Sequence, residues 1–237
     1  MEAIEPTPAL SMPPWAEAFP RLFEIYMTSD HAAPGNWFQQ PNVWPGLLDN
    51  SPGLQPIEED LQVLDPASWA VFHVKAAQLV HLIDKWGYSR ALFDCFNEIK
   101  GYRYLVEAGC QYVRFVPEQQ ETQTPDFRAR SEESTVLMEV KTVNESTKQK
   151  NYFEMPGEER IALDSENRAS DALKNKLTET IGKARRQLFA TQDSSVTRRI
   201  VYVVIRPDFN VHAEKDLATF LEGLSTPGVE VLHYLLS

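Results

Sequence analysis

Apolar and polar positions along the chain follow two periods, which together predict a protein that combines helices with strands. Helical spacing covers the segments 66–86, 91–108, 171–190 and 214–224. Apolar runs of strand length cover 110–116, 135–143, 199–205 and 229–236, and a short extended run opens at Pro125 and Asp126. Because helices fall between the later strands, we predict an α/β domain with a mixed central sheet flanked by helices.

The first 64 residues have a different composition from the rest of the chain. They are rich in proline and also in tryptophan and phenylalanine, whereas disordered segments are poor in aromatic residues. We therefore expect an irregular acidic arm over residues 1–64, with one short helix near Trp15 to Met27, followed by a folded domain over 65–237. The arm packs along the domain, or it covers a protein partner or a second subunit.

The net charge of the chain is -11, which counts against nucleic-acid binding because phosphate groups attract basic surfaces. The charge is unevenly distributed, since residues 1–64 hold nine acidic residues and one basic residue, a net of -8 that leaves -3 for the remainder. The N-terminus lacks the basic start of a signal peptide and no apolar run is long enough to span a membrane, so we expect a cytoplasmic protein. Cys95 and Cys110 have no nearby histidine and are expected to be buried free thiols.

The candidate chemistry lies in the segment 124–143. Side chains alternate along a strand, so Glu139 and Lys141 share one face of the run 135–143. If the two extended runs form a hairpin that brings Asp126 beside Glu139, two carboxylates and one ammonium converge on a volume that suits a hard cation and a water molecule. Taken singly, Pro-Asp is a common turn opener and Glu-x-Lys a common triplet on exposed strands, so a surface ion cluster on an unrelated α/β domain is an alternative.

A carboxylate upstream of this segment extends the pattern. Glu98 lies at the edge of the apolar stripe of the helix 91–108, and Gly109 ends that helix as a C′ glycine would. The order is then helix, strand, strand opening with Pro-Asp, and strand carrying Glu-x-Lys. This order resembles the PD-(D/E)-x-K nuclease superfamily, which has the restriction-endonuclease-like fold. Glu98, Leu105 and Gly109 also resemble the first helix of Holliday-junction-resolvase-like members, and the resemblance runs from residue 91 to the last strand.

The resemblance implies a metal-dependent DNA endonuclease with Glu98, Asp126, Glu139 and Lys141 as catalytic residues. Asp126, Glu139 and the Val140 carbonyl would hold Mg²⁺, for which Mn²⁺ can substitute, while Glu98 would bind the metal through water or hold a second ion. Lys141 would orient the attacking water or stabilise developing charge.

The helix 171–190 carries the clearest basic cluster of the chain. In related nucleases the helix after the Glu-x-Lys strand often carries a glutamine or lysine that reaches the site. We expect nucleic-acid contacts from three of its residues, Lys183, Arg186 and Gln187. The alternative is that these side chains form the solvated face of a surface helix.

Three further questions stay open at the level of sequence. The same fold can serve as a binding module without cleavage, or as a nuclease subunit that gains activity in a restriction, repair or mobile-element assembly. The polar segment 144–170 follows the strand that carries Lys141, so it either borders the active site or is a surface insertion. The substrate is DNA or RNA of undefined form, and a homodimer is a possible state, because cutting two strands favours two sites.

Overall fold

The computed structural model describes residues 13–31, 33–40, 43, 47, 53–84, 89–117, 124–132, 134–144, 169–191, 193–206 and 214–236. The chain divides into two compact units. The first consists of residues 1–65 and 69–92, and the second of residues 66–68 and 93–237. The unit boundaries therefore fall within helices α5 (Pro66–Leu79) and α6 (Arg90–Glu107).

The first unit contains more helix than the sequence analysis expects. Besides most of α5, its described residues form α1 (Trp15–Ala18), α2 (Pro20–Thr28), the 3-10 helix η1 (Trp37–Gln39) and α4 (Gln55–Gln62). The single helix expected near Trp15 to Met27 is two helices, because Phe19 leaves the helical region with φ -131° and Pro20 begins a new first turn.

Aromatic side chains and one buried carboxylate hold these helices together. The Trp15 ring is 5.4 Å from that of Phe23 and 5.6 Å from that of Tyr26, both measured between centroids. Glu58 of α4 is fully buried, and its two carboxylate oxygens accept the backbone N–H groups of Arg21 (2.9 Å) and Leu22 (3.0 Å). These two N–H groups belong to the first turn of α2, where backbone amides have no acceptor within the helix. Glu58 supplies an acceptor for both of them.

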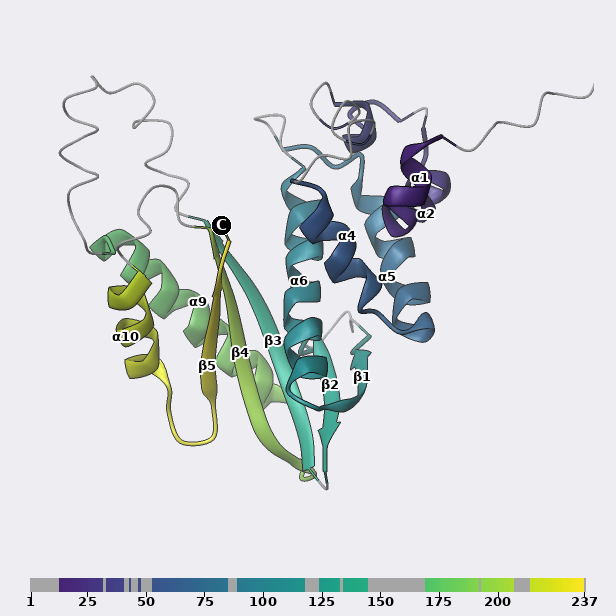
Figure 1. Cartoon of the computed structure of the whole chain (residues 1–237). Coiled ribbons are helices and arrows are strands. Elements are labelled where there is room, and N and C mark those ends of the chain that lie inside the picture. Colours follow the sequence, from purple (N-terminus) through teal and green to yellow (C-terminus); the bar gives the residue numbers. More distant parts are fainter. Residues whose placement is uncertain are drawn as a thin grey trace, which may run out of the picture. The chain divides into compact units, whose positions relative to one another are not determined.

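The second unit is built on a mixed five-stranded sheet in the order β1-β2-β3-β4-β5 (Figure 1). Its strands are β1 (Gln111–Phe115), β2 (Phe127–Ser131), β3 (Ser134–Asn144), β4 (Val196–Arg206) and β5 (Glu230–Leu235). The first three strands pair antiparallel, whereas β3 with β4 and β4 with β5 pair parallel. The predicted α/β class, with a mixed sheet flanked by helices, is confirmed.

Helix α6 lies directly against one face of β3. A Cβ atom added to Gly101 would lie 2.5 Å from Val140 Cγ2 and 3.0 Å from Met138 Sδ, so only glycine permits this approach. Further along, Asn97 Nδ2 donates a hydrogen bond to Thr142 Oγ1 at 3.3 Å. Met138, Val140 and Thr142 therefore share the face that α6 covers, as strand alternation predicts.

The end of α6 follows from its sequence. Gly109 adopts a left-handed conformation with φ +78°, which glycine reaches without steric cost. The amide of Gly109 donates to the Val106 carbonyl (3.0 Å) and that of Cys110 to the Leu105 carbonyl (2.9 Å). These are the two hydrogen bonds of a Schellman motif, which confirms Gly109 as the C′ residue. Cys95 and Cys110 are buried free thiols, also as predicted.

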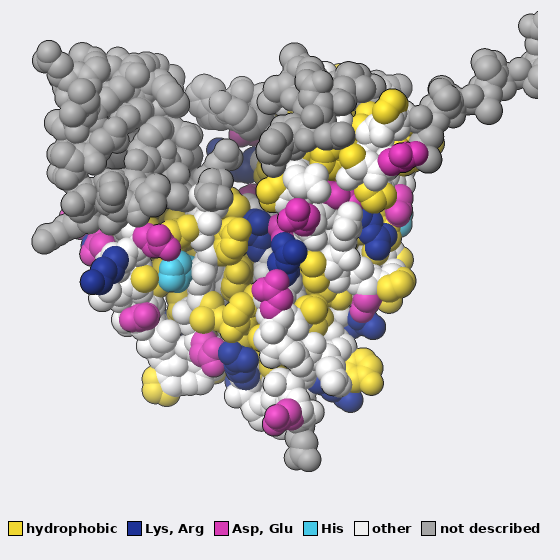
Figure 2. All heavy atoms as spheres, in the orientation of Figure 1, with side chains coloured by type: hydrophobic (Ala, Val, Ile, Leu, Met, Phe, Trp, Pro, Cys, Tyr) yellow, Lys and Arg dark blue, Asp and Glu magenta, His cyan; other side chains and the backbone are white. Residues whose placement is uncertain are grey.

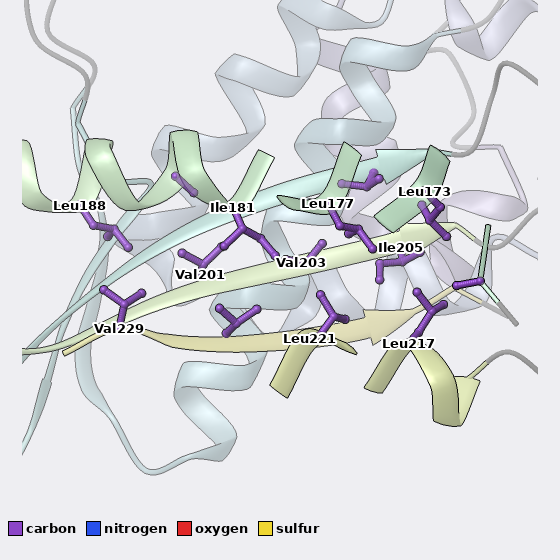
Figure 3. Close-up of a cluster of buried hydrophobic side chains, with 14 of the residues drawn as sticks. Leu173, Leu177, Ile181, Leu188, Val201, Val203, Ile205, Leu217, Leu221 and Val229 are labelled. Atoms are coloured by element: carbon purple, nitrogen blue, oxygen red, sulfur yellow. The ribbon is translucent and has the colours of Figure 1, made fainter. Parts of the chain in front are cut away.

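The other face of the sheet carries α9 (Asp171–Ala190) and α10 (Glu214–Leu224), whose limits coincide with the predicted helices. Leucine and isoleucine side chains from both helices meet valine and isoleucine side chains of β4, as Figure 3 shows. This cluster also contains Leu137 and Val143 of β3. Apolar burial of this kind is the main source of stability for the sheet.

Charged and apolar side chains are interspersed on the surface that Figure 2 displays, without a large area of a single sign. The predicted segment 144–170 lies mostly outside the described residues, which resume at Ala169. Its relation to the candidate site stays a prediction.

Candidate functional site

The candidate site forms where β2 and β3 come together. Phe127 of β2 pairs with Met138 of β3, and this register brings Asp126 beside Glu139, one residue beyond the last pair. The Asp126 carboxylate accepts the backbone N–H of Val140 at 2.7 Å. The hairpin expected from the sequence therefore exists. Where β2 begins, the Asp126 carboxylate, in place of a backbone carbonyl of β2, accepts the next hydrogen bond from β3.

The same hydrogen bond places the Val140 carbonyl. Within a strand, the N–H and C=O of one residue point to the same edge, since both are exchanged with the same opposing residue. The amide of Val140 points toward Asp126, so its carbonyl lies on that side too.

Glu139 is the most unusual residue of the site. It lies on the face of β3 that carries Leu137 and Val143, so it belongs to the layer between the sheet and α9. Its side chain is 0 % exposed. Lys141, on the same face and partly exposed, forms an ion pair with Glu139 Oε1. The second oxygen, Oε2, is buried and accepts no hydrogen bond from the described residues.

Burial and the neighbouring Asp126 determine the protonation of Glu139. Burial, and after it the negative charge of Asp126, raises the pKa of the Glu139 carboxyl to about 8, although the Lys141 ammonium lowers it. Two carboxylates that share a poorly solvated volume disfavour simultaneous ionisation. Below pH 8 the Glu139 carboxyl is therefore mostly protonated, and a cation bound beside it would favour its ionised form.

Helix α9 reaches the edge of this site through Gln187. Its side-chain amide donates to the backbone carbonyl of Thr124, two residues before Asp126. The other two predicted nucleic-acid contacts lie on the exposed surface of α9, where Lys183 Nζ forms an ion pair with Glu179 Oε1 at 2.6 Å and Arg186 is exposed beside them. Of the three residues, Gln187 is the one that a described hydrogen bond joins to the candidate site.

Glu98 lies on α6, half-buried, one residue from Asn97. That helix covers the face of β3 opposite to the face of Glu139 and Lys141. The proposed part of Glu98 in the site stays a prediction.

The donors at the site are hard oxygen atoms. Asp126, Glu139 and the Val140 carbonyl would supply them, and Oε2 of Glu139 is buried and accepts no hydrogen bond from the described residues. Within the described ranges, no group of three or more histidine, cysteine, aspartate or glutamate side chains is placed to hold a metal ion. Mg²⁺ is commonly bound by one or two carboxylates together with several waters, and this donor set fits that pattern.

Sequence reasoning overlooked two arginines of β2 that lie on the same face as Asp126. Arg128 and Arg130 alternate with the buried Phe127 and Ala129, so they lie on the same face as Asp126 and are exposed. The alternation of apolar or small residues with arginines in the sequence FRARS (127–131) could have predicted this exposed face.

The sequence matches no known protein-family profile, and no curated protein matches it either. None of the helices in the described part of the chain has the length and apolar character needed to cross a membrane.

Proposed function

We propose that this protein is a metal-dependent nuclease of the restriction-endonuclease-like class, with its site at Asp126, Glu139 and Lys141. One observation carries the proposal. A buried glutamate lies beside a second carboxylate and a lysine at the junction of two strands, and one of its oxygens accepts no hydrogen bond from the described part of the chain. A carboxylate buried in this way is costly to keep, and such groups concentrate at functional sites.

Each residue then has a part in hydrolysis of a phosphodiester. Asp126, Glu139 and the Val140 carbonyl would hold the metal ion. When bound, Mg²⁺ would supply Lewis acidity and lower the pKa of a water molecule. The Lys141 ammonium, paired with Glu139, would orient the attacking water or stabilise charge developing on the phosphate. Glu98 is assigned to the water ligands of the metal or to a second ion, as the resemblance implies.

A surface ion cluster on an unrelated domain explains the site less well. Charged pairs on a solvated surface stay exposed, whereas Glu139 is buried beneath α9. A binding module without cleavage, or a subunit active only within an assembly, accounts for the acidic first unit, but neither explains why the fold retains a buried glutamate beside a second carboxyl group.

The test compares cleavage of plasmid, linear, single-stranded and branched DNA, and of RNA, in Mg²⁺ or Mn²⁺. The double variant Glu139→Ala, Lys141→Ala should lose activity. The matched control is Arg103→Ala, Glu107→Ala, which removes another ion pair (3.3 Å) from α6, where Arg103 is partly exposed and Glu107 is exposed. Wild type and control should both cleave.

Calorimetry with Mg²⁺ or Mn²⁺ provides a readout besides activity, because binding should depend on Glu139. If wild type neither cleaves any of these substrates nor binds metal through Glu139, the proposed nuclease is wrong.

A further inference from the structure

Strands β1 and β2 form an antiparallel hairpin at one edge of the sheet (Figure 1). Three arginines lie on one face of this hairpin. Arg114 of β1 is directly opposite Arg128 of β2, and Arg130 lies two residues further along β2. Residues directly opposite each other in an antiparallel pair point to the same face. All three side chains are exposed, on the face opposite to that of the buried Phe127, which packs toward α6.

The arginines carry like charges on neighbouring strands. Like charges directly opposite each other on neighbouring strands are destabilising, and the chain as a whole is strongly acidic. Asp193 forms an ion pair with Arg128 at 2.7 Å, which neutralises one of the cations. Arg114 Nη1 donates to the Val113 carbonyl at 2.7 Å. A face that carries three guanidinium groups is complementary to an anionic partner.

An exposed aromatic ring lies beside these arginines. Tyr112 is 66 % exposed, and its ring centroid is 5.7 Å from the guanidinium carbon of Arg130. Its backbone has φ +52°, a left-handed conformation that is unfavourable for tyrosine, within an irregularity of the β1–β2 pairing between Gln111 and Arg114. Irregularities of this kind redirect a side chain, and strain of this kind is found at binding sites. Here the result is a large ring held in solvent.

The arginine face leads to the candidate site. Asp126, Arg128 and Arg130 are two residues apart in turn along β2, so they share a face, the one on which Asp126 meets Glu139. At the rise of a strand, Arg128 is about 7 Å and Arg130 about 13 Å from Asp126 along the chain. A nucleic-acid backbone bound by these arginines would pass to the carboxylates without turning to another surface.

We propose that the face formed by Tyr112, Arg114, Arg128 and Arg130 binds single-stranded nucleic acid and delivers it to Asp126 and Glu139. The arginines contact phosphates, and Tyr112 stacks on a base. A ring can stack on a base only when that base is not enclosed in a duplex, so the exposed tyrosine selects an unpaired strand or overhang. The delivery step rests on the proposed nuclease function, whereas the binding step does not.

Binding can be measured without cleavage, by fluorescence anisotropy of a labelled 20-residue oligothymidylate in EDTA, with a labelled 20-base-pair duplex as comparison. Wild type should prefer the single strand. Tyr112→Asn should weaken binding at least about 5-fold, while Tyr112→Phe should retain it within about 2-fold, since the ring is kept. Asparagine accepts the left-handed conformation, so the melting temperature of Tyr112→Asn should be unchanged or higher. A purely structural tyrosine would give the opposite pair of results.

The arginines are tested by the salt dependence of the same binding. Each phosphate contact contributes a slope of about 0.7 to the plot of log affinity against log salt for single strands. The double variant Arg114→Gln, Arg130→Gln should therefore lower the slope by about 1.4 and leave the Arg128 pair with Asp193 intact. Arg103→Gln on α6 is the matched control and should bind as wild type does.

Four outcomes would overturn the inference. The first two are no binding of the single strand and equal affinity for the duplex. The other two are an unchanged affinity in Tyr112→Asn, and binding of heparin with the same affinity as the single strand and without dependence on Tyr112. Its failure can be told apart from failure of the proposed nuclease. Tight, Tyr112-dependent binding without cleavage in any metal would reject the nuclease and keep this surface. If the protein cleaves, and the Tyr112 and arginine variants bind normally, the nuclease is kept and this surface is rejected.

Discussion

The two faces of strand β3 carry different kinds of side chain. Toward α6, Met138 and Val140 pack so closely against the helix that Gly101 has no space for a Cβ atom. Toward α9, the apolar series of Leu137 and Val143 is interrupted by Glu139 and Lys141. One face is filled by packing, and the other keeps a buried carboxylate with an unpartnered oxygen. A buried carboxylate costs stability that an apolar side chain would not, and this difference between the faces is what the proposed function rests on.

The largest difference between the two faces should be in cleavage rate, and it should come from substitution of Lys141. Lys141→Met keeps an apolar stem and removes the ammonium, so cleavage should fall at least about 100-fold, or roughly 2.7 kcal/mol in transition-state free energy. Met138→Leu on the α6 face conserves volume and should cleave within about 2-fold of wild type. The measurement is initial rate on the substrate that wild type cuts best. Equal losses in both variants would mean that the faces do not differ in this way.

The protonation of Glu139 should make the stability of the metal-free protein depend on pH. Its pKa is raised to about 8, so between the ordinary range of a glutamate and pH 8 the folded state binds a proton that the unfolded state lacks. The free energy of unfolding should therefore be highest at acidic pH and fall as pH rises toward 8, by about 1 kcal/mol per pH unit. Glu139→Gln cannot ionise and should remove this dependence.

Denaturant unfolding in EDTA from pH 5 to pH 8.5 measures the slope in both proteins. Added Mg²⁺ should restore stability to wild type at pH 8, since binding requires the ionised carboxylate, and should leave Glu139→Gln almost unchanged. Parallel curves for the two proteins would contradict the assignment of the slope to Glu139.

Two glycines test the packing of the helices on the two faces. Gly101→Ala places a methyl group 2.5 Å from Val140 Cγ2, which should destabilise the protein by about 1–3 kcal/mol despite the better helix propensity of alanine. At Gly182 in α9 the added Cβ would meet its nearest atom at 3.8 Å, so Gly182→Ala should stabilise by up to about 1 kcal/mol. Thermal or denaturant unfolding distinguishes them, and stabilisation by both would show that α6 can move away from β3.

The elements of the second unit could be predicted because their signals are local. The periodicity of Asp171–Ala190 and the glycine at position 109 define helix ends without knowledge of neighbours, and alternation in the run 135–143 places Glu139 and Lys141 on one face. The break at Phe19 shows the limit, since Trp15 to Thr28 has enough apolar residues for a single helix. There Pro20 begins a second helix, whose first turn is capped by Glu58 from a segment distant in sequence.

The geometry of the site could be predicted only in part. That Asp126 and Glu139 meet follows from a hairpin, but the full burial of Glu139 depends on α9, which packs from thirty or more residues further along the chain. The hydrogen bond from Val140 to Asp126 depends on where β2 begins. The left-handed backbone of Tyr112 lies in the irregularity of the β1–β2 pairing, and no local pattern in β1 announces it. Long-range packing determines all three features.

The smallest predicted change in stability concerns two side-chain amides that join helices α9 and α6 to the segment of β2 and β3. Gln187 of α9 donates to the Thr124 carbonyl beside the site, and Asn97 of α6 donates to Thr142 on the opposite face. Gln187→Ala and Asn97→Ala should each lower the free energy of unfolding by about 0.5–1.5 kcal/mol, since each removes one hydrogen bond. Their effects on cleavage should differ, because Gln187 positions the backbone next to Asp126.

We expect Gln187→Ala to lower kcat about 3- to 10-fold with little change in KM, and Asn97→Ala to leave both constants unchanged. Gln187→Glu is the sharper variant, since it keeps the length of the side chain and removes the donor, and it should resemble Gln187→Ala in kcat. Steady-state kinetics at a temperature where all variants are folded gives both constants. A loss of kcat in Asn97→Ala as large as in Gln187→Ala would mean that cleavage senses the stability of the hairpin rather than the side of the sheet on which the amide lies.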